Sequence, residues 1–156
     1  MSMCYWMCEG IGIEQGVLLP FVDGMKLAKA IVDNNDFDAD VTMDEIEEDY
    51  EFSRQDNQTQ VELLMKDYLS DENDALPALL LSADEKNALV SCNDNDGQYF
   101  LLYPPRYPWI NSDGFTSMEE VVEYLCDVLL KFCRDDVTRE EIRAIIDTDV
   151  HAVGCG

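Results

Sequence analysis

The sequence predicts an α+β fold in a single domain, residues 1–156, in which a small antiparallel sheet of about three strands packs with about four or five helices. One observation is a β-hairpin pattern over residues 87–103, where two apolar runs flank a polar turn that contains Gly97. The other is a series of amphipathic segments that begin with residues able to cap a helix. Apolar residues form 47% of the 156 positions, enough for a hydrophobic core.

The first part of the chain predicts one strand and one helix. Residues 5–13 are apolar, aromatic and interrupted by glycine, a pattern that favours an extended strand. Pro20 and the Asp23-Gly24 pair then break regular structure. Asp23 is placed to cap a helix over residues 25–32, whose apolar positions recur on one face.

Residues 33–51 are the most acidic segment, with ten carboxylates and neither Lys nor Arg. Apolar side chains are interleaved with these acids, so we expect a folded acidic face rather than a disordered run of like charge. The apolar residues that would anchor this face are Phe37, Val41, Met43, Ile46 and Tyr50.

The acidic segment changes period at Thr42. Before it, Asp36, Asp38 and Asp40 alternate with apolar residues, as they would in a strand. From Thr42 the spacing is helical, and a glutamate three residues later completes a capping-box pattern. The acids that share one face of this predicted helix are Asp44, Glu47, Glu48 and Glu51.

The middle of the chain predicts a further helix and an ambiguous apolar run. A capping-box pattern at Thr59 begins a segment with a clear apolar stripe, which should end as a helix near Ser70. The apolar run 75–82 is interrupted by Pro77, so it is typical of either a strand or a buried turn. Its residues 79–82 are a candidate third strand beside the hairpin.

The last part of the chain predicts a stiff loop and two helices. Residues 104–114 contain too many prolines for a central strand. Overlapping capping boxes at Thr116 and Ser117 begin the longest and most apolar helix, over residues 118–133, which we expect to lie against the sheet. Thr138 begins a final short helix by the same pattern.

The charge balance constrains the partners. The chain has 34 acidic and 10 basic residues, a formal net charge of −24. Such a protein is repelled by nucleic acids and anionic membranes and attracted to basic surfaces. We therefore expect no direct binding to DNA or RNA. The sequence has neither a signal-peptide pattern nor a membrane-spanning apolar run. We expect a soluble cytoplasmic protein whose six cysteines stay reduced.

The acidic face is a candidate nucleic-acid mimic. Carboxylates two apart on a strand lie about 6.5 to 7 Å apart, and those three or four apart on a helix lie about 5 to 6 Å apart. Both spacings are comparable with those of neighbouring phosphates, so a rigid scaffold could occupy a nucleic-acid groove competitively. The alternative is that the acids only keep the protein soluble. The candidate partner-binding residues are Asp36, Asp38, Asp40, Asp44, Glu47, Glu48 and Glu51.

A short, acidic chain without an enzyme motif resembles the phage-borne anti-defence proteins, notably the anti-CRISPR inhibitors that imitate nucleic acid. The start C-Y-W-M-C-E-G-I-G-I and the segment Y-P-P-R-Y-P-W also resemble small proteins of gut Firmicutes and their mobile elements. The resemblance implies a protein partner with a basic nucleic-acid-binding surface, such as a bacterial defence nuclease.

The alternative function is a structural domain with a zinc clip between its termini. Cys4 and Cys8 form a C-x3-C pair, and His151 and Cys155 form an H-x3-C pair, so the four residues could make a Cys3His site. These cysteines could equally be buried thiols without a metal. We expect the protein to bind no cofactor.

The sequence does not predict an enzyme. The sole histidine, His151, is close to the last residue, and no third group is evident to orient it as the base of a Cys-His pair. The Asp-rich turn 92–103 resembles the start of a calcium loop but has Cys92 and Tyr103 where two carboxylates are needed. A glycine-rich phosphate loop is also absent.

Overall fold

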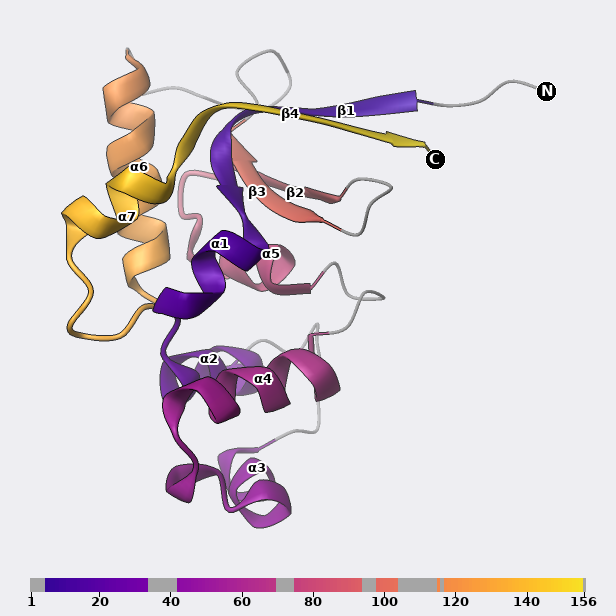
Figure 1. Cartoon of the computed structure of the whole chain (residues 1–156), viewed down its shortest axis with the longest axis vertical. Coiled ribbons are helices and arrows are strands. Elements are labelled where there is room, and N and C mark those ends of the chain that lie inside the picture. Colours follow the sequence, from indigo (N-terminus) through magenta and orange to yellow (C-terminus); the bar gives the residue numbers. More distant parts are fainter. Residues whose placement is uncertain are drawn as a thin grey trace.

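A computed structural model describes residues 5–33, 42–69, 75–93, 98–103, 115 and 117–155. The sheet, α6 and α7 form one end of the molecule, α2, α3 and α4 form the other, and α1 and α5 lie between them (Figure 1). The described strands and helices are β1 (Tyr5–Glu14), α1 (Gln15–Leu18), α2 (Gly24–Asp33), α3 (Met43–Tyr50), α4 (Asn57–Asp67), α5 (Ala75–Leu80), β2 (Val90–Asn93), β3 (Tyr99–Tyr103), α6 (Met118–Leu130), α7 (Arg139–Ile145) and β4 (Asp147–Cys155). The α+β class is therefore confirmed.

The sheet is antiparallel throughout, with strand order β2-β3-β1-β4. The predicted hairpin is present as β2 and β3, while its turn, with Gly97, lies outside the described residues. The predicted first strand is β1, which lies between β3 and β4. Tyr5 pairs with Cys155, so backbone hydrogen bonds between β1 and β4 join the two ends of the described chain.

Two glycines let β1 change direction inside the sheet. The pairing of β1 with β4 shifts register between Gly10 and Gly12, and Gly10 has a φ of 146°, which side chains disfavour. β1 turns sharply between its two halves (Figure 1). Val150 of β4, opposite Gly10, packs with Phe100 and Leu102 of β3, so the glycines allow β4 and β3 to meet across β1.

One cluster of buried side chains extends from the sheet to α2, α3 and α4. The predicted cap of α2 is confirmed, since Asp23 Oδ1 accepts hydrogen bonds from the backbone N–H groups of Met25 and Lys26. α6 is the most apolar of the predicted helices and contacts α7 and β1. It ends at Leu130 rather than at residue 133. The capping box that begins α7 is confirmed at Thr138.

The segment after α6 joins the two ends of the molecule. Asp23 N donates to Phe132 O at 2.8 Å, and Arg134 N donates to Phe21 O at 3.0 Å. Lys26 Nζ donates to Cys133 O at 2.7 Å and forms an ion pair with Asp135. These contacts hold the start of α2 against the end of α6.

Two further predicted details are wrong. Residues 79–82 do not form a strand: they belong to α5 and the 3-10 turn Leu81–Ala83. Pro77 fits there because it is in the first turn of α5, where its missing N–H would have no intrahelical partner. α4 begins at Asn57, two residues before the predicted Thr59, because Asp56 is the cap and accepts a hydrogen bond from Thr59 N at 2.7 Å. The third strand of the sheet is β1, and β4 was not predicted.

The cysteines do not all match the expectation of reduced thiols. Cys92 of β2 is disulfide-bonded, so that expectation is wrong for this residue. Cys126 and Cys133 are free and buried. None of the helices in the described ranges is long and apolar enough to span a membrane. Cytoplasmic localisation stays a prediction.

Candidate functional site

The predicted acidic helix is present as α3, at the end of the molecule opposite the sheet (Figure 1). Thr42 caps it, with its Oγ1 accepting a hydrogen bond from Glu45 N at 3.2 Å. Ile46 is fully buried and anchors the helix in the core, as predicted. The alternating acids Asp36, Asp38 and Asp40 lie outside the described residues, so their place on this face stays a prediction.

The acids of α3 do not all present their carboxylates in the same way. Asp44, Glu48 and Glu51 are exposed, whereas Glu47 is half-buried. Each carboxylate oxygen of Glu47 accepts a hydrogen bond from Ser53, one from the backbone N–H and one from Oγ, both at 2.6 Å. The bond from the Ser53 hydroxyl, followed by that from its amide, holds the pKa of Glu47 below its ordinary value. Glu47 therefore holds the turn after α3, and of the four acids predicted to share one face, Asp44, Glu48 and the C-cap residue Glu51 stay exposed.

Positive charge is unevenly distributed over the described residues. All four arginines there form ion pairs: Arg54 with Glu51, Arg134 with Asp136, Arg139 with Glu123 and Asp127, and Arg143 with Glu123. Two lysines do the same, Lys26 with Asp135 and Lys131 with Glu85. Among the ion pairs of the described side chains, only that of Arg54 involves an acid next to α3, and its 3.9 Å separation is long for a hydrogen bond. Asp44 and Glu48 of α3 therefore lack, within the described residues, the arginine partners that Glu123 and Asp127 of α6 have.

The strand register bears on the proposed zinc clip. Cys8 is opposite Ala152, whereas His151 is opposite Glu9, one position along each strand. Successive positions of a strand belong to opposite faces of a sheet, so Cys8 and His151 are on opposite faces by register. His151 Nε2 instead lies 2.9 Å from Asp149 Oδ1. Among the residues with described side chains, no group of three potential ligands could hold a metal; Cys4 and the side chains of Cys8 and Cys155 are outside that set.

The cysteine and histidine side chains that are described do not form a nucleophilic pair. Burial raises the pKa of Cys133 to about 11 and also raises that of Cys126, so both thiols stay protonated near neutral pH. The Cys133 thiol donates to Leu129 O. His151 is exposed on β4 and contacts Asp149. This arrangement does not activate a thiol.

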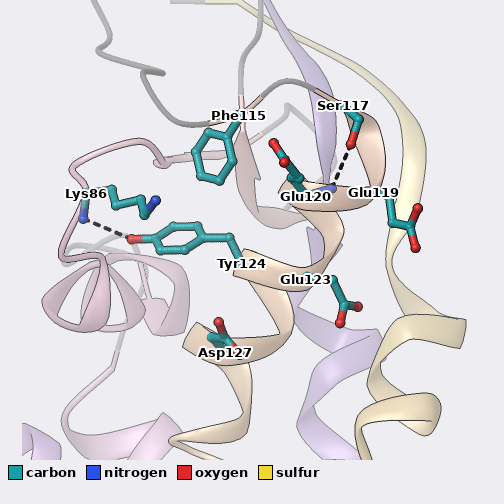
Figure 2. A pocket seen from close by; sticks show the side chains of 8 residues that line it. All are labelled: Lys86, Phe115, Ser117, Glu119, Glu120, Glu123, Tyr124 and Asp127. Carbon is teal, nitrogen blue, oxygen red and sulfur yellow. Dashed lines mark hydrogen bonds between the residues drawn. The ribbon is translucent and has the colours of Figure 1, made fainter.

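A groove beside α6 is a second candidate site, and sequence reasoning missed it (Figure 2). Its volume is about 550 Å³. It is lined by residues of α6, the segment that precedes it and the turn after α5: Lys86, Phe115, Ser117, Glu119, Glu120, Glu123, Tyr124 and Asp127. A second hollow of about 590 Å³ adjoins it and shares Lys86, Tyr124 and Asp127.

Aromatic rings and one lysine form the centre of the groove. The Lys86 ammonium lies beside two rings that contact each other, 5.0 Å from the centroid of Phe115 and 5.7 Å from that of Tyr124 (Figure 2). Both distances are within the range of cation–π attraction. The two ring centroids are 5.3 Å apart, and Tyr103 of β3 packs edge-on against Phe115 at 5.4 Å.

Tyr124 is held by the turn after α5. Its hydroxyl donates to Asp84 Oδ1 at 2.5 Å and accepts a hydrogen bond from Lys86 N at 3.0 Å. Burial, together with the bond to Asp84, raises the pKa of Tyr124 to about 12. The same Asp84 carboxylate accepts hydrogen bonds from Ala88 N and Leu89 N, which fixes the turn. The phenol is therefore neutral and fixed in place.

The sequence contains part of the signal for this groove. Glu120, Tyr124 and Asp127 recur at helical spacing on one face of α6. Lys86 is about forty positions before Tyr124 in the chain, and only the tertiary contact of its turn with α6 brings it beside the rings. Comparisons with protein-family models, with curated proteins and with solved structures find no match for this chain.

Proposed function

We propose that this chain is a non-enzymatic binding protein that presents the acidic face of α3 to a basic surface on another protein, one that normally binds nucleic acid. The observation that supports this most is the uneven pairing of charge. Exposed carboxylates at Asp44 and Glu48 have no cation beside them in the described residues, whereas Glu123 and Asp127 of α6 form ion pairs with arginines of α7.

The scaffold of α3 favours binding over mere solubility. Ile46 is fully buried and Thr42 caps the helix, so the exposed carboxylates are held on a folded element. The Glu47 contacts with Ser53 fix the turn that follows. Carboxylates four apart on a helix are about 5 to 6 Å apart, a spacing comparable with that of phosphates. A fixed row of this kind loses less conformational entropy on binding than a flexible acidic tail.

The test compares two variants with equal charge change. Asp44→Asn with Glu48→Gln removes two charges from α3. Glu140→Gln with Asp147→Asn removes two exposed charges from α7 and β4, at the other end of the molecule (Figure 1). Each protein is titrated against a panel of nucleic-acid-binding enzymes with basic grooves, bacterial defence nucleases among them. DNA is added as competitor, and the salt concentration is varied.

The proposal predicts that DNA displaces the protein and that rising salt weakens binding. The α3 variant should bind about fivefold more weakly, since two exposed charge contacts contribute about 0.2–1 kcal/mol each. The α7–β4 variant should change affinity less than about twofold, because its charges are far from the contact and screened over about 8 Å.

Several results would contradict the proposal. Equal weakening by both variants would show that only net charge matters. Binding that resists both competitor DNA and about 0.5 M salt would rule out competition for a basic groove, since exposed charges are screened over a few ångströms there. Failure of the protein to bind any enzyme of the panel would also count against the proposal.

A further inference from the structure

We propose that the groove beside α6 binds a basic side chain, arginine or lysine, of a peptide segment from a partner protein, and that Lys86 occupies the same position when the peptide is absent. This site is distinct from the acidic face of α3. It does not depend on the proposed function, because its evidence is an aromatic pair that already holds an ammonium group.

The rings define which ligand fits. Phe115 and Tyr124 are half-buried, and an ammonium lies about equally near both, at 5.0 and 5.7 Å from their centroids. Lys86 itself is exposed, so solvent can replace it without unfolding the chain. A primary ammonium or a guanidinium is therefore the group that these rings accept.

The charges around the rings favour the same ligand. Glu119 and Glu120 line the groove and are exposed in the first turn of α6; Glu120 lies on the side of Phe115, whereas Glu119 projects to the other side of the helix (Figure 2). Glu123 and Asp127 also line it and form ion pairs with arginines of α7. Four of the eight lining residues are acidic and one is basic, so lysine or arginine residues on either side of the inserted side chain would approach a net negative lining. An acidic or neutral peptide would not gain these contacts.

The site is organised before binding. Asp84 fixes both the Tyr124 hydroxyl and the turn that carries Lys86. Asn87 completes this turn in the left-handed region, with a φ of 53°. Lys86 contacts Tyr124 in two ways, but only its backbone N–H bonds the hydroxyl. Truncating the Lys86 side chain therefore vacates the rings and leaves the turn intact.

The test uses Lys86→Ala with Lys66→Ala as its matched control. Both substitutions remove one exposed positive charge, but Lys66 is on α4, away from the groove. The probes are the fluorescent peptide acetyl-(Gly-Arg)3-amide and its uncharged counterpart acetyl-(Gly-Gln)3-amide. Fluorescence anisotropy gives the affinities at physiological salt.

Lys86→Ala should bind the arginine peptide about two- to fivefold more tightly than Lys66→Ala, because displacing an exposed cation–π contact costs about 0.5–1 kcal/mol. Phe115→Leu, added to Lys86→Ala, should remove this gain because leucine is apolar but has no aromatic face. The glutamine peptide should bind to neither protein.

Three outcomes would overturn the proposal. Equal affinities of Lys86→Ala and Lys66→Ala would mean that the peptide responds only to net charge. A gain that survives Phe115→Leu would place the peptide elsewhere. Binding of the glutamine peptide would show that the cation is not what the groove recognises. The comparison of the two lysine variants decides the matter even if Phe115→Leu fails to fold.

Discussion

Replacing Gly12 by alanine should force β1 and β3 apart. A Cβ at this position would lie 2.1 Å from the carbonyl oxygen of Leu101 and 2.5 Å from Cδ2 of Leu102. Leu102 is 1% exposed and packs with Phe100 and Val150, so its side chain has little room to move. The Leu101 oxygen belongs to the backbone of the paired strand and can move only with that strand.

The size of the effect follows from these two contacts. Overpacking a core with one methyl group costs about 1–3 kcal/mol. Separating the strands also weakens one or two ladder hydrogen bonds, each with a net value of about 0.5–1.5 kcal/mol. The free energy of unfolding should therefore fall by about 1.5 to 6 kcal/mol. The Tm of a chain of this size should fall by roughly 3 to 24 °C, at about 2–4 °C per kcal/mol.

Urea and thermal unfolding, followed by circular dichroism under non-reducing conditions, measure both values. Gly16→Ala is the control, because a Cβ there would meet only the flexible carboxylate of Glu14, at 2.8 Å. That carboxylate caps α1, and the lost cap and the gained helix propensity are of similar size, about 1 kcal/mol each. Gly16→Ala should therefore change stability by less than about 1 kcal/mol. If Gly12→Ala behaves like this control, the close approach of β1 and β3 is refuted.

Two further substitutions test the electrostatic contacts. Tyr124→Phe should cost about 0.5–1.5 kcal/mol through the lost bond to Asp84, and an alkaline absorbance titration should lose the tyrosine that ionises at a pKa of about 12. Because folding raises the pKa of Tyr124, the stabilisation that it contributes is present below about pH 10 and is lost as pH rises toward 12. If the variant still shows a tyrosine that ionises near 12, the assignment of this pKa to Tyr124 and its bond to Asp84 is contradicted. Ser53→Ala should raise the pKa of Glu47 toward its ordinary value, as followed by carboxyl NMR. The stabilisation from Glu47 is present above the pKa that it has in the unfolded chain and is lost as pH falls through its lowered pKa in the folded chain. If the Glu47 titration midpoint is the same with and without Ser53→Ala, the hydrogen bond from the Ser53 hydroxyl does not form.

The elements that the sequence predicts well are those whose signals are local. Thr42 and Thr138 begin α3 and α7 because a side-chain oxygen satisfies a backbone N–H three residues away. The β2–β3 hairpin is likewise a short-range pattern. Within the acidic segment, helical spacing identified both the buried Ile46 and the exposed carboxylates of α3.

The secondary structure was predicted wrongly where one local sequence pattern is compatible with both a strand and a helix. The apolar run around Pro77 satisfies a buried strand and a short buried helix equally well, and packing against β3 determined that it is α5. β4 carries few apolar residues before Val150, so it has no strand signal of its own. It is a strand because β1 supplies its hydrogen-bonding partner.

The sequence by itself determined the charge, the capped helices and the acidic face of α3, because these depend on residues a few positions apart. Only the tertiary structure decided which carboxylates remain available. It pairs Glu123 and Asp127 with arginines of α7, engages Glu47 with Ser53, and leaves Asp44 and Glu48 exposed. Folding alone also places Lys86 beside the rings of Phe115 and Tyr124. Such contacts join residues far apart in the chain, so their existence depends on the packing of whole elements rather than on any local pattern.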